Sequence, residues 1–517
     1  MTASEQLAQF AAGSKALPKL CREYKKERAT VHLKELVGGA LSFYAAAAVA
    51  KTGGVHIFVA EDRDAAAYLL NDFYNLLDEK QVYFFPSSYK RSAAYGAEDA
   101  QGVVQRTTAM NAVRGFTKGY LVVCTYPEAL AERVVDAATL QRDTIAVKLG
   151  DKISIAVLED ALADANFTRV DFVYEPGQYS VRGGIVDVFS YSESKPYRID
   201  FFGDEVDSIR RFNISSQLSA DKLDRVEIVP NLNAGEAPRV SFVQFAGSSA
   251  TCWFYDADYV LRRVNDLRRK VLADMEEPGQ IDRLLTSRNV LLRDMAGNSV
   301  VALRDNLPER PATAAVVFDT APQPKFNKNF EMLADDMIRN SLRGYATYIL
   351  SENKVQVERL ENIFHQIGRG QAAVRSLSVT LHEGFVDNDL KLCLYTDHQI
   401  FDRYQRYRIN GEIRRDEQMT VAELNQLRPG DYVVHIDHGV GRFDGLVKIN
   451  ENGKVHEAIK LVYKDGDVLF VNVHSLHRIS RYKSGDGEPP KVYKLGNGAW
   501  QKLKNAAKKA VKDISRE

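Results

Sequence analysis

Residues 430–482 constrain the fold of this chain more than any other segment, because their pattern predicts a small, closed β module. Three apolar-rich runs with partial period-two alternation span Tyr432–Ile436, Ala458–Tyr463 and Val468–Val473. The last two runs are joined by Lys464–Asp467, in which Asp-Gly provides the positive φ angles of a tight hairpin turn. A barrel of about five short strands fits this length, and its edge suits the docking of a peptide or protein. The segment contains no catalytic constellation.

The whole chain is too long for a single hydrophobic core, since 517 residues correspond to roughly three or four domains. Lys and Arg together number 69, as do Asp and Glu, so no basic field marks the whole chain as a nucleic-acid binder. Any contact with nucleic acid is therefore expected to be local.

The four cysteines predict no disulfide framework and no zinc ribbon. Cys21, Cys124, Cys252 and Cys393 are far apart and form no CxxC pair, which is typical of a reducing compartment. The N-terminus lacks the basic-then-apolar pattern of a signal peptide, and the apolar stretch 40–50 is too short to span a bilayer. We therefore expect a cytoplasmic chain with no membrane partner.

Changes in pattern along the sequence divide the chain into several regions. Helical patterns alternate with short β runs in the first region, which predicts an α/β domain with a mostly parallel sheet. Hairpin signals then predict an α+β insert, and a second alternation of helices and strands predicts another α/β domain. The predicted boundaries are 1–127 with 227–310 for the first α/β domain, 128–226 for the insert, 311–401 for the second α/β domain, 402–429 for a polar linker, 430–484 for the β-barrel and 485–517 for a basic amphipathic helix.

A phosphate-binding loop is suggested by Gly38-Gly39, which precedes an Ala-rich helical pattern. A working loop of the GxxxxGK[ST] type needs a Lys that reaches the phosphates and a Ser or Thr that holds Mg²⁺, and neither is present at the required spacing. The segment Leu36–Phe43 therefore predicts a glycine-bearing entry to a buried helix. We expect neither ATP nor Mg²⁺ as a cofactor of this chain, and no catalytic residues.

Histidines cluster in the β module, and four of them form two HxxH pairs. His435, His438, His456, His474 and His477 are five of the ten histidines in the chain. Imidazole is a common zinc ligand, but residues i and i+3 of a strand face opposite sides, so a pair converges only where a turn intervenes. We favour a structural role in which His435 and His438 order a strand end over a metal site.

A second candidate surface lies in the insert, on the run Tyr197–Phe202. Period-two alternation places Arg198, Asp200 and Phe202 on one face of a strand, with Ile199 and Phe201 on the other. Arg beside a carboxylate and an exposed aromatic ring is the composition of many protein–protein hot spots. By pattern alone, a solvated and charge-balanced strand face is the favoured explanation of these residues, because such faces are ordinary in antiparallel sheets.

Two segments resemble a known family. The β module resembles the RNA-polymerase-interacting domain of bacterial transcription-repair coupling factors (Mfd), which is similar to CarD-type regulators, in Gly430-Asp431, His435, His438–Arg442, Ser475-Leu476 and Ser480–Tyr482. The insert is similar to the UvrA-binding domain shared by UvrB and Mfd in Phe167–Val170, Tyr179–Phe189 and Tyr197–Glu205. Ser180 stands where the UvrB pattern has Arg, and Asp200 stands in place of Glu. The resemblance implies UvrB-like α/β domains with an inserted α+β UvrA-binding domain, followed by a small Tudor/SH3-like β-barrel.

The resemblance also implies partners and site residues. UvrA is expected to bind Arg169, Arg182, Arg198, Asp200 and Phe202. The RNA polymerase β subunit is expected to bind Arg442, Ile449, Leu461 and Leu469, with Ile449 as an apolar anchor. In the complete family member, a DNA translocase that uses ATP and Mg²⁺ follows the β module, so DNA contacts and ATP hydrolysis are expected to lie outside this chain. We expect a bacterial, cytoplasmic monomer that recruits UvrA to polymerase stalled at DNA lesions.

Two rival functions remain open at this stage. A UvrB-like excision-repair helicase would require a phosphate-loop Lys and an aromatic-rich hairpin that probes damage, and the sequence contains neither. A CarD-like transcription regulator would account for the β module but leaves the first 400 or so residues without a role.

Overall fold

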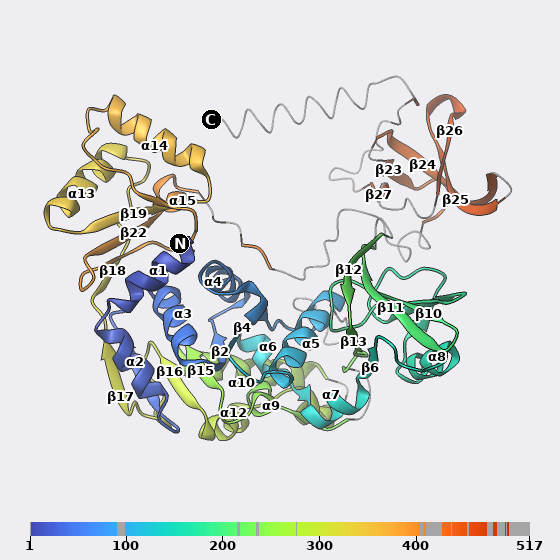
Figure 1. Cartoon of the computed structure of the whole chain (residues 1–517), viewed down its shortest axis with the longest axis horizontal. Helices are drawn as coiled ribbons and strands as arrows, with labels where there is room; N and C mark the ends of the chain where they lie inside the picture. The colour runs from blue at the N-terminus through green and yellow to red at the C-terminus, as the bar shows by residue number, and fades with distance from the viewer. Residues whose placement is uncertain are drawn as a thin grey trace. The chain divides into compact units, whose positions relative to one another are not determined.

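The structure is a computed structural model of the chain (Figure 1). It describes residues 2–89, 99–214, 218–233, 237–275, 277–403, 405, 407–409, 427–435, 437–451, 454–472, 479–482, 492 and 494–495. The side chains of residues 448–451, 454–457, 472 and 481 lie outside this description. The chain divides into two compact units, a larger one of Met1–Phe212 with Ala220–Glu412 and a smaller one made mainly of Ile413–Glu517.

The first domain is built on a seven-stranded sheet, and all of its strand pairs are parallel. Its central strands are almost wholly buried, as expected for a parallel sheet that is covered on both faces. In spatial order they are β17 (Ala314–Val317), β1 (Thr30–Lys34), β16 (Ser299–Ala302), β15 (Thr251–Phe254), β2 (Gly54–Val59), β4 (Tyr120–Thr125) and β3 (Val82–Phe84). The prediction of an α/β domain with a mostly parallel sheet is confirmed.

Helices cover this sheet, and several of them begin at a side-chain cap. Asp62, for example, accepts a hydrogen bond from the backbone N–H of Ala65 and so starts α4. The helices of the domain are α1 (Ala3–Ala12), α2 (Ala16–Tyr24), α3 (Ala40–Thr52), α4 (Arg63–Leu76), α5 (Ala100–Arg114), α6 (Pro127–Ala131), α7 (Ala137–Asp143), α9 (Phe242–Ala246), α10 (Ala257–Asp274), α11 (Ile281–Leu284) and α12 (Arg288–Asp294), with 3₁₀ turns η1 (Glu79–Gln81), η2 (Pro278–Gln280) and η3 (Met295–Gly297). Strands β5 (Val134–Val135) and β14 (Arg239–Val240) form a small separate ladder.

Two of the predicted domain boundaries differ from those in the structure. β17 was expected to open the second α/β domain, but it pairs in parallel with β1, and Val31 lies opposite Ala314. The insert was expected from residue 128, but Leu130 and Leu140 pack in the core of the first domain, and the insert's own core begins at Ile145 and Val147. In both cases the domain to which a segment belongs is set by the hydrophobic core in which its side chains pack.

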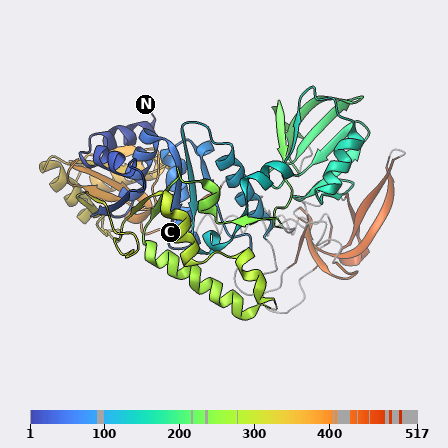
Figure 2. The same ribbon diagram turned by 90° about the horizontal axis from the view of Figure 1, so that it is seen from below.

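The insert is a six-stranded sheet with one helix on its apolar face. In spatial order the strands are β12 (Ser219–Leu223), β11 (Glu205–Phe212), β10 (Tyr197–Phe202), β9 (Ile185–Val188), β8 (Gln178–Arg182) and β7 (Thr168–Arg169). Helix α8 (Ile155–Asp164) buries Leu158 and Leu162 against Val186, Ile199 and Ile209, and Figure 2 shows it beside the sheet. A two-stranded ladder of β6 (Ile145–Lys148) and β13 (Arg225–Ile228) connects the insert to the first domain.

The second α/β domain is a five-stranded mixed sheet with helices α13 (Phe330–Leu342), α14 (Lys354–Gln366) and α15 (Asp397–Ile400). Its strands in spatial order are β18 (Thr320–Pro322), β21 (Phe385–Asp387), β22 (Leu392–Thr396), β19 (Ala346–Leu350) and β20 (Ser376–Leu377). Leu381 and Phe385 belong to the core of the first domain, so the two α/β domains share packing. The first described residues of the predicted linker pack on the first domain. Tyr407 donates a hydrogen bond to Asp64 on α4, and Ile409 is 4% exposed.

In the described part of the β module, five strands pair in one sheet, in agreement with the predicted number. Their spatial order is β26 (Val468–Asn472), β25 (Lys454–Val462), β24 (Gly439–Glu451), β23 (Tyr432–His435) and β27 (Ile479–Arg481). All pairs are antiparallel, and among the described residues β26 and β27 lie at the two edges and do not pair with each other. The predicted Asp-Gly turn lies in η4 (Lys464–Gly466), with φ of 65° at Asp465 and 83° at Gly466.

Two other expectations concern the chain as a whole. All four cysteines are unpaired and buried. Within the described ranges, no helix has the length and apolar composition that crossing a membrane requires. The predicted basic helix 485–517 lies outside the described residues except for Val492, Lys494 and Leu495.

Candidate protein-binding site

The insert sheet has one apolar and one polar face, as the alternation predicted. Tyr179, Val186, Val188 and Ile199 point to the core that α8 covers. Two cross-strand rows of the opposite face follow the register of β8 to β11: Ser180, Asp187, Arg198 and Arg210 in one, and Arg182, Ile185, Asp200 and Ser208 in the next. We refer to these eight residues together with Phe202 as the polar face.

Asp187 is the centre of the polar face. Its carboxylate is 1% exposed and accepts hydrogen bonds from Arg198 Nε at 2.7 Å and Arg198 Nη2 at 2.9 Å. The same carboxylate also forms an ion pair with Arg182. The hydrogen bonds to Asp187 raise the pKa of Arg198 above its ordinary value. A bidentate Arg–carboxylate pair fixes the guanidinium plane as well as its position, so one buried acid orients both arginines.

Aromatic rings complete the support of the two arginines. The guanidinium carbon of Arg198 lies 4.5 Å from the centroid of the Phe212 ring, and that of Arg182 lies 4.7 Å from the centroid of Phe172. Such cation–π contacts restrict the guanidinium from one side. Arg182 also donates a hydrogen bond to the backbone oxygen of Asp171 at 3.1 Å. Both arginines are therefore held rigidly before any partner arrives.

Phe202 is the most exposed large apolar side chain of the polar face. It is 84% exposed and precedes the turn at Gly203, whose φ is 64°. The backbone N–H of Phe201 donates to the oxygen of Gly184 at 2.8 Å, which ties the two hairpin ends together. Asp200, close to this end, accepts hydrogen bonds from Ser208 and Arg210. An exposed aromatic ring beside fixed charges is suited to binding a protein.

Arg169 is not brought together with the other four predicted residues. It lies on the edge strand β7 opposite Tyr179, a residue of the apolar face, and forms an ion pair with Glu159 of α8 at 2.6 Å. Ser180, where the UvrB pattern has Arg, is 1% exposed and donates a hydrogen bond to the backbone oxygen of Asp171. A long charged side chain at position 180 would not fit this buried site.

Sequence reasoning missed Asp187 and Arg210. Asp187 stands between Val186 and Val188 in a strand pattern, which places it on the polar side. That alternation could have found it, but its partner Arg198 follows only from the register of β9 with β10.

The outer face of the β module presents a second candidate surface. Tyr432, Arg442, Val462 and Val468 form a cross-strand row, and Arg442 donates a hydrogen bond to the Tyr432 hydroxyl at 2.9 Å. The next row contains Phe470, which is 49% exposed, and Val468 is 40% exposed. Both lie on β26, an edge strand among the described residues, and the edge of a sheet suits β-strand addition.

Two of the predicted polymerase contacts require correction. Leu461 is 0% exposed, and Leu469 lies opposite it, partly buried against the same core. Alternation along β26 therefore points Leu469 inward and leaves Val468 and Phe470 outside. Arg442 is exposed as expected. The side chain of Ile449 lies outside the described residues, although its backbone belongs to β24.

His435 and His438 have the structural arrangement that the sequence predicted. His435 is 3% exposed, and its Nδ1 accepts a hydrogen bond from the backbone N–H of Asp437 at 3.1 Å. The ring of His438 lies 4.7 Å from that of His435, between centroids. In the described part of the chain, no group of three or more His, Cys, Asp or Glu is placed to hold a metal ion. His474 and His477 lie outside the described residues.

The glycine segment of the first domain does not form a phosphate cradle. A Cβ atom built on Gly39 would lie 2.1 Å from the backbone oxygen of Glu383, so the chain before β21 packs directly on the glycine turn. Ser42 donates hydrogen bonds to Gly39 O and to Asp72, which is a neighbour that repels phosphate.

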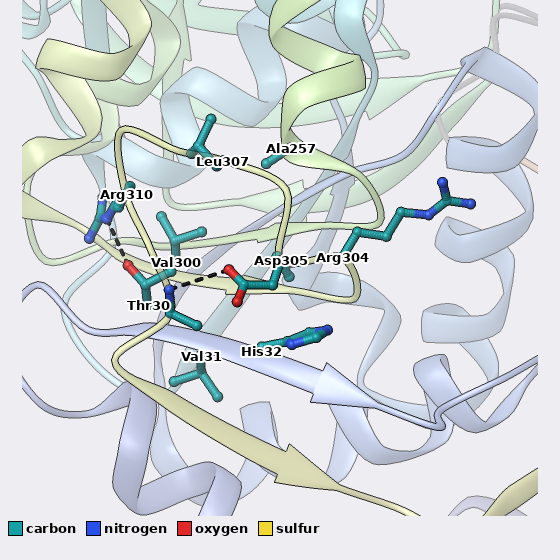
Figure 3. A pocket seen from close by; sticks show the side chains of 11 residues that line it. Thr30, Val31, His32, Ala257, Val300, Arg304, Asp305, Leu307 and Arg310 are labelled. Carbon is teal, nitrogen blue, oxygen red and sulfur yellow. Dashed lines mark hydrogen bonds between the residues drawn. The ribbon is translucent and has the colours of Figure 1, made fainter.

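A small hollow beside β1 is structural. Its volume of about 10 Å³ holds at most one water molecule. Arg310 Nε donates a hydrogen bond to Thr30 Oγ1 at 2.9 Å, which is drawn as a dashed line in Figure 3. Arg310 also donates to the backbone oxygens of Met295 and Asn298, so its guanidinium ties loops together and is not available to a ligand.

Comparison with known proteins matches the two segments that contain these surfaces. The UvrB interaction domain matches residues 145–233, and the CarD-like/TRCF RID domain matches residues 427–483. Along the whole chain, the transcription-repair-coupling factor of Bacillus subtilis strain 168 is 24% identical over 573 residues, covering 93% of this chain and 48% of the relative. The protein of the same name from Escherichia coli K12 is 24% identical over 557 residues, covering 94% of this chain and 48% of the relative.

The chain matches an N-terminal fragment of a transcription-repair-coupling factor. It spans about half the length of the curated relatives it matches. The resemblance stated from sequence motifs is thereby confirmed. The match to the UvrB interaction domain begins at residue 145, where the structure places the start of the insert's core.

Proposed function

We propose that this chain is a cytoplasmic adaptor that binds UvrA through the polar face of the insert and the RNA polymerase β subunit through the outer face of the β module. It would thereby bring nucleotide excision repair to polymerase stalled at DNA damage. ATP hydrolysis and DNA translocation would belong to the part of the relatives that this chain does not match, so the chain itself needs neither ATP nor Mg²⁺. We propose a monomer.

The observation that carries the proposal is the polar face itself, which lies within the segment similar to the UvrB interaction domain. A strand face that merely meets solvent does not require a buried acid between two stacked arginines. Asp187 is 1% exposed, whereas Phe202, further along β10, is 84% exposed. Rigid charges next to an exposed ring reduce the ordering cost of association, which supports protein docking over a solvated face.

Phe202→Ala is expected to weaken UvrA binding by at least about thirtyfold, the effect of removing an aromatic hot spot worth about 2 kcal/mol. The melting temperature should not change, because the ring is 84% exposed. Binding is measured by calorimetry with purified UvrA and the whole chain. Leu149→Ala, at an exposed apolar residue after β6 in the same domain, is the matched control. Equal affinities for wild type and Phe202→Ala would show that UvrA uses another surface.

Phe470→Ser is expected to lower the affinity for the polymerase β subunit at least tenfold, since burying a side chain of this size contributes about 1.5–3 kcal/mol. The module should stay folded, because Phe470 points away from the core that contains Leu461 and Val471. Surface plasmon resonance with immobilised β subunit measures the change, and Val317→Ser serves as an exposed apolar control on another domain. If Ile449→Arg abolishes binding and Phe470→Ser does not, the polymerase contact lies on the hairpin of β24 and β25, which contains Ile449, and not on Phe470 of β26.

The two rival functions predict different partners. A CarD-like regulator would bind polymerase but not UvrA, and a UvrB-like helicase component would hydrolyse ATP on single-stranded DNA. The segment Leu36–Phe43 contains no Lys, and its glycine turn packs against Glu383, which favours the adaptor over the helicase. One pull-down of UvrA and β subunit with the chain separates the adaptor from the regulator.

A further inference from the structure

The first domain contains a cavity of about 340 Å³ that neither docking face uses. Its walls come from the carboxyl ends of the parallel strands, where open α/β sheets hold their ligands. Leu36 follows β1, Ala60 follows β2, Tyr255 follows β15 and Leu303 follows β16. The turn Gly38-Gly39 and helix α4 close the sides. The volume lies at the small end of the range for small-molecule sites.

The charges in this cavity are opposite to those of a nucleotide site. Three acids line it, Glu61, Asp72 and Glu383, and its described lining residues include neither Lys nor Arg. The guanidinium of Arg304 lies 5.7 Å from the ring centroid of Tyr255, but Asp256 pairs with it at 3.4 Å. A phosphate group entering here would meet three carboxyl groups and no cation, so phosphate esters are disfavoured.

The remaining walls are aromatic and apolar. Phe58, Tyr68, Trp253, Phe254 and Tyr255 line the cavity, and the ring of Tyr68 stacks on His382 with centroids 3.7 Å apart. Phe58 and Trp253 are nearly fully buried, whereas Tyr255 is 42% exposed, and Glu61 and Glu383 are exposed. Aromatic faces attract organic cations, and carboxylates near the opening add a favourable charge.

We propose that this cavity binds a small organic cation, an amine or guanidine on an apolar body, with the apolar body against Phe58 and Tyr68 and the charged group at Glu61 and Glu383. The glycine turn and the strand ends form the walls of the pocket, and the loop before β21 places Glu383 against the glycine turn. The inference is independent of UvrA and polymerase binding.

Three indole compounds of similar size whose side chains carry different charges test the proposal. Tryptamine is a cation, tryptophol is neutral and indole-3-acetate is an anion. By calorimetry with the whole chain, tryptamine is expected to bind with Kd below about 1 mM and at least tenfold more tightly than tryptophol. Indole-3-acetate and ATP are expected to give no saturable heat. Agmatine, an aliphatic guanidine, tests whether the aromatic ring is required.

Variants locate the site. Glu61→Gln with Glu383→Gln is expected to weaken tryptamine binding at least tenfold, and Glu352→Gln, an exposed acid of the second α/β domain, should leave it unchanged. Ala65→Phe fills the cavity from α4 and should abolish binding; its melting temperature reports whether it folds. The proposal is overturned if neither tryptamine nor agmatine binds at about 1 mM, if tryptophol binds as tightly as tryptamine, or if the Gln variant binds normally.

Discussion

Asp187→Ala is expected to open the insert sheet, with a loss of roughly 3 kcal/mol in its local free energy of unfolding. The change leaves Arg198, which is 15% exposed, next to Arg182 without the acid that both contact. Removing one partner of a buried ion pair leaves uncompensated charge, and Arg182, at 34% exposed, keeps the effect near the lower end of the range for such pairs. The same variant should lose UvrA binding, because neither guanidinium would stay in place.

Hydrogen exchange measures this loss in the relevant segment of the multidomain chain. Amide protection of β8 to β11, residues 178–212, should fall by about a hundredfold, whereas protection of the parallel sheet should stay unchanged. Asp207→Ala, at an exposed acid on β11, is the matched control. Asp187→Asn should give an intermediate loss, since the amide keeps one acceptor oxygen. Arg198→Ala should lower the local free energy of unfolding less in the Asp187→Ala background than in the wild type. Additive losses in the double variant would show that the two residues do not act as a pair.

Asp72→Asn is expected to stabilise the first domain at alkaline pH. Burial raises the pKa of Asp72 to about 7, hydrogen bonds from Ser42 Oγ and the backbone N–H of His382 partly oppose this, and the nearby charge of Glu383 adds to it. Cys124, a buried thiol of β4, is another titratable neighbour, and burial raises its pKa as well. The folded pKa of Asp72 therefore lies above its ordinary value of 3.8.

The direction of the pH dependence follows from that raised pKa. Below about pH 4 the carboxyl is protonated in both states and costs no stability. Between that pH and about 7 the unfolded chain releases the proton while the folded chain keeps it, so the stability of the wild type falls as pH rises. The cost is fully present above pH 7 or so, and the neutral amide of the Asp72→Asn variant removes it. That amide can also satisfy the site, because Ser42 already donates to Gly39 O and can accept from the amide.

The measurement is urea unfolding monitored by Trp253, which is 3% exposed in β15, in a Trp500→Phe background. The variant should match the wild type near pH 4 and exceed it by roughly 2–4 kcal/mol at pH 8. Glu352→Gln should show no such pH-dependent difference, since Glu352 is exposed. A difference that stays constant with pH would contradict a raised pKa at Asp72.

Elements with local signals were predictable, and those set by distant partners were not. Helix α14 lies in the region where the sequence predicted alternating helices and strands, and its signals, the helical period and the cap Asn353, are local. β17 was assigned to the wrong sheet, because its pairing with β1 joins residues more than 280 positions apart. In the β module, period-two alternation separates Val468 and Phe470 from Leu469, but it does not say which set faces the core. The structure places Leu461 and Leu469, the contacts implied by the resemblance, on the core side.

The sequence by itself determined the hairpins of the insert, through Gly183-Gly184 and Gly203-Asp204, and its two-faced strands, because turn geometry and alternation depend on neighbouring residues. It also determined that the phosphate loop lacks its Lys. Only the tertiary structure decided that Asp187 links Arg182 to Arg198, that Arg169 turns to α8 instead, and that the acids of positions 61, 72 and 383 meet in one cavity. These contacts join strands, helices and domains whose relative placement is fixed by burial of distant apolar side chains, which local pattern does not encode.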